Sequence, residues 1–157
     1  MLVAVAARSD AAFTLLHSHN DVQAYPAAAV IADGLGNLYG TTVAGGFSNA
    51  GTVFKVKTDG TGFTLLHAFA AGPSDGENPR APLILDGSGN LYGTTSGGGS
   101  SYVGTVFRVK TDGTGFTLLH SFAEGESVGE NPSSSLILDR SGNLYGTTGG
   151  GGSSNLG

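Results

Sequence analysis

Cysteine is absent from the 157 residues, and charged residues make up only 12% of them. Without cysteine, no disulfide can stabilise the fold. The 7 basic residues are scattered among 12 acidic ones, which gives a net charge of −5 and leaves no basic stripe that could follow a phosphate backbone. Nucleic acid is therefore excluded as an expected partner.

Long hydrophobic runs are missing as well. No stretch reaches the about 18 apolar residues that a membrane-spanning helix needs, so the sequence predicts no membrane partner. The opening residues 1–7 lack the positive charge and the hydrophobic length of a signal peptide. The chain is instead rich in glycine, with 28 residues, and this composition is typical of short β-strands joined by many turns.

The sequence repeats with a period of 53 residues. The segment Gly-Asn-Leu-Tyr-Gly-Thr-Thr begins at Gly36, Gly89 and Gly142. Phe-Thr-Leu-Leu-His begins at Phe13, Phe63 and Phe116, and Gly-Thr-Val-Phe begins at Gly51 and Gly104. Blocks that share one period indicate stacked copies of one unit. We interpret residues 1–157 as a single repeat domain with units 1–50, 51–103 and 104–157.

Each unit contains four short apolar runs, too short for helices and closed by turn residues, which predict four β-strands. In the best-defined copy the predicted strands are 82–85, 91–96, 105–110 and 116–122. The first strand has counterparts at 28–32 and 135–138, and its continuous apolar character favours burial on both faces. The turns at 86–90 and 111–115 are tight, whereas the loops at 97–103 and 124–131 are long.

Four antiparallel strands that recur at this period predict an all-β fold, a β-propeller with three blade-equivalents per chain. A Ca²⁺-binding β-helix is the structural alternative, but its nine-residue glycine and aspartate pattern is missing. Propellers need about four to eight blades, so we expect closure by oligomerisation of the chain with itself. A homodimer would give six blades and a homotrimer nine, with the N-terminal strands of one copy completing the C-terminal blade of another.

The blocks 89–95 and 104–107, joined by a glycine-rich loop, resemble the GloVer tandem-repeat family, also called choice-of-anchor repeat proteins. Residues 82–92 are similar to NHL-type propeller blades. The resemblance implies a bacterial, exported or surface-anchored propeller of unassigned activity, and it supplies no catalytic residues. The chain itself shows no signal peptide and no anchor, so its compartment is left open.

Two residue types recur once per unit. His17, His67 and His120 lie in the predicted fourth strand, where packing or cross-strand hydrogen bonds are expected unless two or three converge on a metal. Tyr39, Tyr92 and Tyr145 lie in the second strand, where they pack between blades or wall a ligand channel. Asp86, Ser88 and Asn90 resemble a Ca²⁺ loop only weakly, because Leu91 replaces the needed glycine, so we predict a turn and no metal or cofactor.

The long loops predict a binding rim, because variable loops on a rigid scaffold often carry recognition. The candidate rim residues are aromatic or acidic, namely Phe47, Tyr102, Asp75, Glu77, Glu124, Glu126 and Glu130. Such a rim suits a carbohydrate or a basic peptide, or it is simply a solvated acidic surface. The sequence lacks serine-hydrolase, zinc-protease and phosphate-binding motifs. We therefore expect a non-enzymatic binding scaffold. The alternative is a carbohydrate-active hydrolase or lyase, which would need paired carboxylates.

Overall fold

The computed structural model describes residues 2–7, 13–18, 25–26, 28–124, 129–152 and 157. Two four-stranded antiparallel sheets form its centre, each with its strands in chain order. The first sheet contains β3 (Ile31–Ala32), β4 (Asn37–Thr42), β5 (Thr52–Lys57) and β6 (Thr64–Ala68). The second sheet contains β8 (Ile84–Leu85), β9 (Asn90–Thr95), β11 (Thr105–Lys110) and β12 (Thr117–Ser121). The predicted all-β, antiparallel fold is confirmed.

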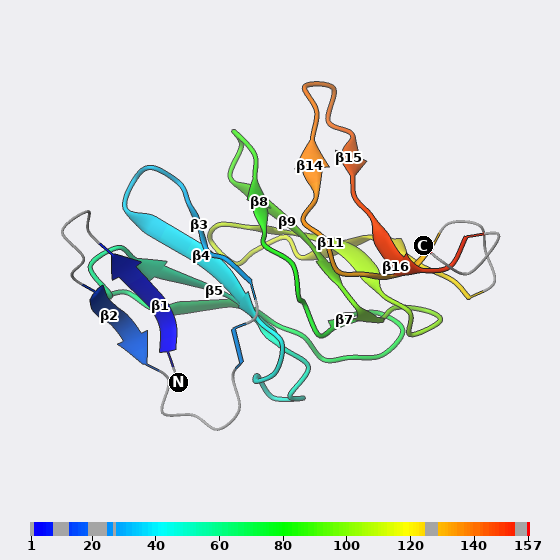
Figure 1. The fold of residues 1–157 in the computed structure, drawn as a ribbon, viewed down its shortest axis with the longest axis horizontal. Coiled ribbons are helices and arrows are strands. Elements are labelled where there is room, and N and C mark those ends of the chain that lie inside the picture. Colours follow the sequence, from blue (N-terminus) through cyan, green and yellow to red (C-terminus); the bar gives the residue numbers. More distant parts are fainter. Residues whose placement is uncertain (1, 8–12, 19–24, 27, 125–128, 153–156) are drawn as a thin grey trace.

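A two-stranded hairpin lies at each end of this pair of sheets (Figure 1). The N-terminal hairpin pairs β1 (Leu2–Ala7) with β2 (Phe13–Ser18), and the C-terminal hairpin pairs β14 (Ile137–Leu138) with β15 (Leu144–Tyr145). Over the described ranges the sheets form an open row and do not close into a ring. None of these ranges contains a helix long and apolar enough to cross a membrane.

Two short strand pairs tie the long loops together, and the sequence did not predict them. β7 (Gly76–Glu77) pairs with β10 (Gly97–Gly98), and β13 (Glu130–Pro132) pairs with β16 (Thr148–Gly150). A Cβ atom on Gly76 would lie 2.5 Å from the Thr95 side chain. These backbones approach too closely for most side chains, which explains why glycines without apolar periodicity form strands here.

The predicted strand boundaries hold best where side chains alternate between buried and exposed. Residues 105–110 form β11 as predicted, with Phe107 and Val109 buried while Lys110 is exposed. The first strand of the unit is shorter than predicted, because Ile84 and Leu85 alone pair with β9. Leu83 is 1% exposed and both paired residues are half-buried, so the run is covered on its two faces only in part. Proline at the start of this run has no amide hydrogen to donate to a ladder.

The main core lies between the two sheets. The first sheet and the loop after it contribute Tyr39, Val53, Leu66 and Phe69, and the second sheet with its preceding loop contributes Leu83, Leu91, Phe107 and Val109. A second, smaller cluster with Phe54 and Val56 lies on the opposite face of the first sheet. Each four-stranded sheet therefore has an apolar side toward the preceding unit and an apolar side toward the following one.

Close packing inside each sheet depends on one glycine in the second strand of the unit. A Cβ atom on Gly93 would lie 2.6 Å from the Phe107 ring and 2.9 Å from Leu83, and Gly40 has the same relation to Phe54 and Val30. The hydrogen of glycine leaves room for the ring to lie flat across the strand. A steric requirement therefore explains why the Tyr-Gly-Thr segment has glycine at this position.

Replacing Gly93 with alanine should therefore destabilise the fold by about 1–3 kcal/mol, because the added methyl group overpacks a buried site. Gly87→Ala is the matched control, since a Cβ there would meet no heavy atom within 4 Å. The control should change the free energy of unfolding by less than about 0.5 kcal/mol. Urea unfolding of both variants measures the difference, and equal stabilities would contradict this packing.

Candidate functional site

The interface between the first and second sheets is filled by aromatic side chains. The rings of Phe69 and Phe107 lie 5.2 Å apart in an edge-to-face arrangement. Phe116 stacks on His67 with a centroid distance of 3.6 Å and an interplanar angle of 6°. Phe69 is 1% exposed and Phe107 is fully buried. Phe107 of β11 and Phe116, directly before β12, thus pack against the first sheet, and we call this contact the closed interface.

A backbone junction joins successive units beside this packing. The amide of Asn78 donates a hydrogen bond of 2.8 Å to the carbonyl of Ala50, and a Cβ on Gly51 would lie 2.6 Å from Cδ of Pro79. The next junction repeats the geometry: Asn131 donates to Val103 at 2.8 Å, and Pro132 packs on Gly104. Both prolines are buried. The contact between units is therefore a repeated feature of the molecule.

A cavity of about 540 Å³ lies between the second sheet and the C-terminal hairpin. It is mainly apolar, and the side chains around it include Val106, Leu119, His120, Phe122, Leu136 and Leu144. The first four of these belong to the second sheet or its flanking residue, and the last two belong to the segment that leads into the C-terminal hairpin and to the hairpin itself. We call this cavity the slot.

The slot lies one unit after the closed interface and is lined by the corresponding residues of the repeat. The aromatic side chains that the second sheet packs into the closed interface have no counterpart in the slot among the described residues. Leu66 is 6% exposed in the closed interface, whereas its counterpart Leu119 is 43% exposed. His67 is half-buried, and His120 is exposed. In the second sheet β9 pairs with β11, but the corresponding strand β15 has no second neighbour among the described strands. In the closed interface the corresponding side chains are covered by residues of the third and fourth strands of the second sheet and the residue before the fourth.

The tight turn in each unit is held by an aspartate. The Asp86 carboxylate accepts hydrogen bonds from the amides of Ser88 and Asn90 at 2.8 Å, from the Asn90 side chain at 2.7 Å and from the Tyr92 hydroxyl at 3.1 Å. Asp33 and Asp139 make the same contacts in their units. This carboxylate organises the turn, and the described part of the chain contains no cluster of three or more His, Asp or Glu residues suited to a metal.

These hydrogen bonds shift the pKa values of the groups involved. The bond from the Asn37 side chain holds the pKa of Asp33 at about 2, with burial acting in the opposite direction and the amides of Leu35 and Asn37 lowering the pKa further. Burial and the bond to Asp33 raise the pKa of Tyr39 to about 12. The turn carboxylate is therefore held as an anion, and the tyrosine is held as a neutral donor.

The three repeated tyrosines differ in their surroundings. Tyr39 is 2% exposed inside the closed interface, Tyr92 is half-buried, and Tyr145 in the C-terminal hairpin is 52% exposed. Each hydroxyl bonds to the turn aspartate of its own unit at 3.1 Å. The difference in exposure follows from how much of a following unit covers each ring.

The repeated histidines do not converge within the described residues. His67 lies 3.2 Å from the Asp75 carboxylate and stacks on Phe116, so it ties a strand to the loop that follows it. His120 contacts Phe122 edge-to-face and lines the slot. His17 lies in β2, and its side chain is outside the described part of the chain.

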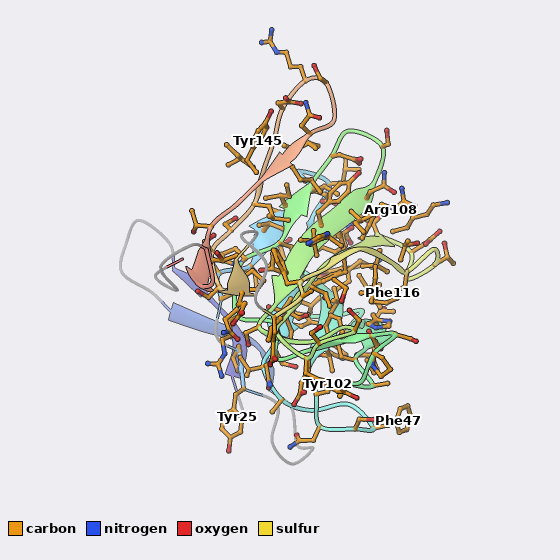
Figure 2. The ribbon with its side chains drawn as sticks, turned by 90° about the vertical axis from the view of Figure 1, so that its right-hand side faces the viewer. Tyr25, Phe47, Tyr102, Arg108, Phe116 and Tyr145 are labelled. Atoms are coloured by element: carbon orange, nitrogen blue, oxygen red, sulfur yellow. The ribbon has the colours of Figure 1, made fainter. Side chains whose placement is uncertain are left out.

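The predicted rim residues fall into two groups. Phe47 is fully exposed and Tyr102 is 61% exposed, and Figure 2 shows both near the lower edge of the view, together with Tyr25. Glu124 is exposed too. Other acidic candidates belong to the short strand pairs, with Glu77 in β7 and Glu130 in β13, both half-buried, while Glu126 is outside the described residues.

Asp75 is part of the loop structure. Its carboxylate accepts hydrogen bonds from the amides of Ala70 and Gly76 at 2.9 and 2.7 Å, beside its contact with His67. Burial acts to raise the pKa of Asp75, but these bonds hold it below its usual value. Asp75 therefore stabilises the rim and has little capacity left for a ligand.

Sequence reasoning missed two features of this region. Tyr25 is 60% exposed and stands one period before Asn78, directly ahead of a proline, as Asn78 does. The slot residues Val106, Leu119 and Phe122 were not singled out, although the repeat contained the signal. Their counterparts one period earlier, Val53, Leu66 and Phe69, are all in the core.

The comparisons with known proteins concern the family. The family model described as Gloeobacter/Verrucomicrobia repeat matches residues 5–157. This match confirms the resemblance seen in the repeated blocks. No curated protein matches the chain.

The turn carboxylates predict a loss of stability in acid. The pKa of Asp33 lies at about 2 in the folded protein, against 3.8 ordinarily. Its contribution is therefore present above about pH 4 and is lost as the pH falls from about 4 to about 2. Asp33→Asn should show a shallower fall of the unfolding free energy over this range in urea titrations. A variant with the same pH dependence as the wild type would contradict the assignment.

Proposed function

The chain belongs to the Gloeobacter/Verrucomicrobia repeat family, and from this premise we propose that it is a non-enzymatic binding scaffold of the β-propeller type, closed into a ring by copies of itself. The observation that carries the proposal is the slot. An apolar face that is buried in one unit recurs in the next with greater exposure, most clearly at Leu119, between elements that are otherwise arranged in the same way.

The repeated junction supports a radial arrangement of units. Each unit contacts the next through the same proline, glycine and amide hydrogen bond. Identical head-to-tail contacts generate a ring when the rotation closes. Two four-stranded sheets and two complementary hairpins amount to three blade-equivalents, so two copies would supply six blades and three copies nine. Six lies within the usual range for propellers.

The loop rim is the proposed recognition surface, and we define it by the loops 43–51, 69–75 and 99–104. The amide of Gly99 donates to the carbonyls of Gly72 and Asp75 at 3.0 and 2.8 Å, which joins two of these loops. Phe47 and Tyr102 project from this rigid support. Exposed aromatic rings beside polar groups suit the apolar faces of a carbohydrate, so we propose a carbohydrate ligand for the rim.

The mass of the protein in solution tests the ring. Light scattering should give two or three times 15.6 kDa, because the apolar slot favours association. A measurement over a range of concentrations separates a closed ring, which reaches a fixed mass, from an open polymer, which grows. A folded monomer at every concentration would overturn the proposed ring.

A glycan array tests the rim. Wild-type protein should bind a defined class of glycans, and the double variant Phe47→Ala/Tyr102→Ala should lose binding by at least about 10-fold, because aromatic stacking is removed. Leu35→Ala is a matched control, since Leu35 is 87% exposed in the tight turn of the first sheet. An array without binders, or a double variant that binds as the wild type does, would contradict a carbohydrate ligand.

A further inference from the structure

The slot lacks an aromatic ring from a third strand. In the second sheet a Cβ atom on Gly93 would meet the Phe107 ring at 2.6 Å, and Gly40 in the first sheet has the same relation to Phe54. Their counterpart Gly146 lies in the slot, where a Cβ would meet Leu136 at 2.7 Å and no aromatic ring within the described residues. The space that a phenylalanine occupies in both sheets is therefore open beside Gly146.

An aromatic ring from a fourth strand is missing too. In the closed interface the ring of Phe116, which directly precedes β12, stacks on His67. The counterpart of His67 in the slot is His120, which is exposed and contacts Phe122 of its own unit. The slot thus offers a histidine face to a phenylalanine that must come from a following unit.

We propose that the slot binds the N-terminal hairpin, β1–β2, of a second copy of this chain, with Phe13 of that copy stacked on His120. The proposal rests on the ring proposed above and names the segment that closes it. The sequence of residues 13–17 is identical to that of residues 63–67 and 116–120. Phe13 is thus the counterpart of Phe116.

Strand pairing within the N-terminal hairpin supports this assignment. Leu2 pairs with Ser18 as Thr105 pairs with Ser121, and Val5 pairs with Leu15 as Phe107 pairs with Leu118. The register shift between Ala4 and Val5 corresponds to the one between Val106 and Phe107, and the N-terminal hairpin has a further shift between Leu2 and Ala4 that β11–β12 lacks. β1 and β2 therefore correspond to the third and fourth strands of a unit, the two strands that the C-terminal hairpin lacks.

The hairpin proposed to fill the slot comes from a second molecule. Figure 1 shows the N-terminal hairpin beside β4 and β5 at one end of the row, and the C-terminal hairpin at the other end. The chain's own β1–β2 hairpin is therefore too far from its own slot.

A second contact points to the same neighbour. Pro79 and Pro132 are buried at their junctions, whereas the equivalent Pro26 is exposed. Gly157 has φ +90°, and its amide donates to Gly151 at 3.1 Å, as that of Gly104 donates to Gly98 at 3.2 Å. Gly157 thus has the backbone that receives a proline in the earlier junctions. Pro26 of the docked copy would pack on it.

A small apolar ligand explains the slot less well. Thr94 lines the slot, and its buried hydroxyl has no hydrogen-bond partner within the described residues. Its counterpart Thr41, however, has the same unpaired hydroxyl in the first sheet. The unpaired hydroxyl is therefore a property of the repeat and does not indicate a ligand.

Docking also predicts an imperfect fit. Val5 stands where Phe107 stands in the second sheet, so the docked hairpin fills the space beside Gly146 with a smaller side chain. Val5→Phe should therefore strengthen assembly, because it restores the ring found in both complete sheets. Most substitutions in an apolar interface weaken association. A variant that strengthens it therefore discriminates well between this docking and others.

Sedimentation equilibrium of the full 157-residue chain tests the proposal. Phe13→Ala and His120→Ala should each weaken assembly by at least about 10-fold, and Val5→Phe should strengthen it by a similar factor. Phe47→Ala is the matched control, since it removes the same ring from a fully exposed position and should leave assembly unchanged. Circular dichroism checks that each variant is folded.

An assembled wild type whose mass is unchanged by Phe13→Ala and His120→Ala would overturn the docking while the proposed ring stands. A wild type that is a folded monomer would overturn both, whether the slot is open or is filled by a segment outside these 157 residues.

Discussion

A four-stranded sheet with two apolar faces must be covered on both sides, and the rest of this structure depends on that constraint. The second sheet meets it on one side, where Phe107 and Phe116 pack against Phe69 and His67. On its other side Leu119 and His120 are exposed around the slot, although Phe122 is 9% exposed. Because burial of apolar surface is the main favourable term in folding and association, a partly covered sheet favours a further partner.

The polar features of the repeat serve this packing. The turn aspartates fix the tyrosines of the second strand, and the tyrosine of the first sheet is part of the core between units. Asp75 and His67 connect a loop to a strand at the edge of the same interface. The turn aspartates, Asp75 and His67 are thus engaged in local hydrogen bonds. The aromatic residues of the loop rim, in contrast, are exposed and contribute nothing to the packing of the core.

Much of this fold could be predicted from the sequence because the three repeat copies, once aligned, show the same pattern of apolar runs and turns. The alternation of Phe107 and Val109 with basic residues fixed β11 to the residue. The pairs β7–β10 and β13–β16 could not be found in this way, since glycine backbones in close approach leave no apolar pattern. The rim was predicted only in part, because a sequence does not distinguish an exposed acidic residue such as Glu124 from one held in a loop such as Asp75.

The slot was recognised by comparing the exposure of equivalent residues in successive units. Neither a sequence motif nor the composition contains this information. Leu66 and Leu119 are the same residue in the same repeat position, and from their different exposure we infer a neighbour at the slot. Hydrogen exchange tests most directly whether that neighbour exists. In the native protein at high concentration, the amides of residues 143–148 should be protected to the same degree as those of residues 90–95, because β15 then has a strand on both sides. Rapid exchange at 143–148 beside slow exchange at 90–95 would contradict the account.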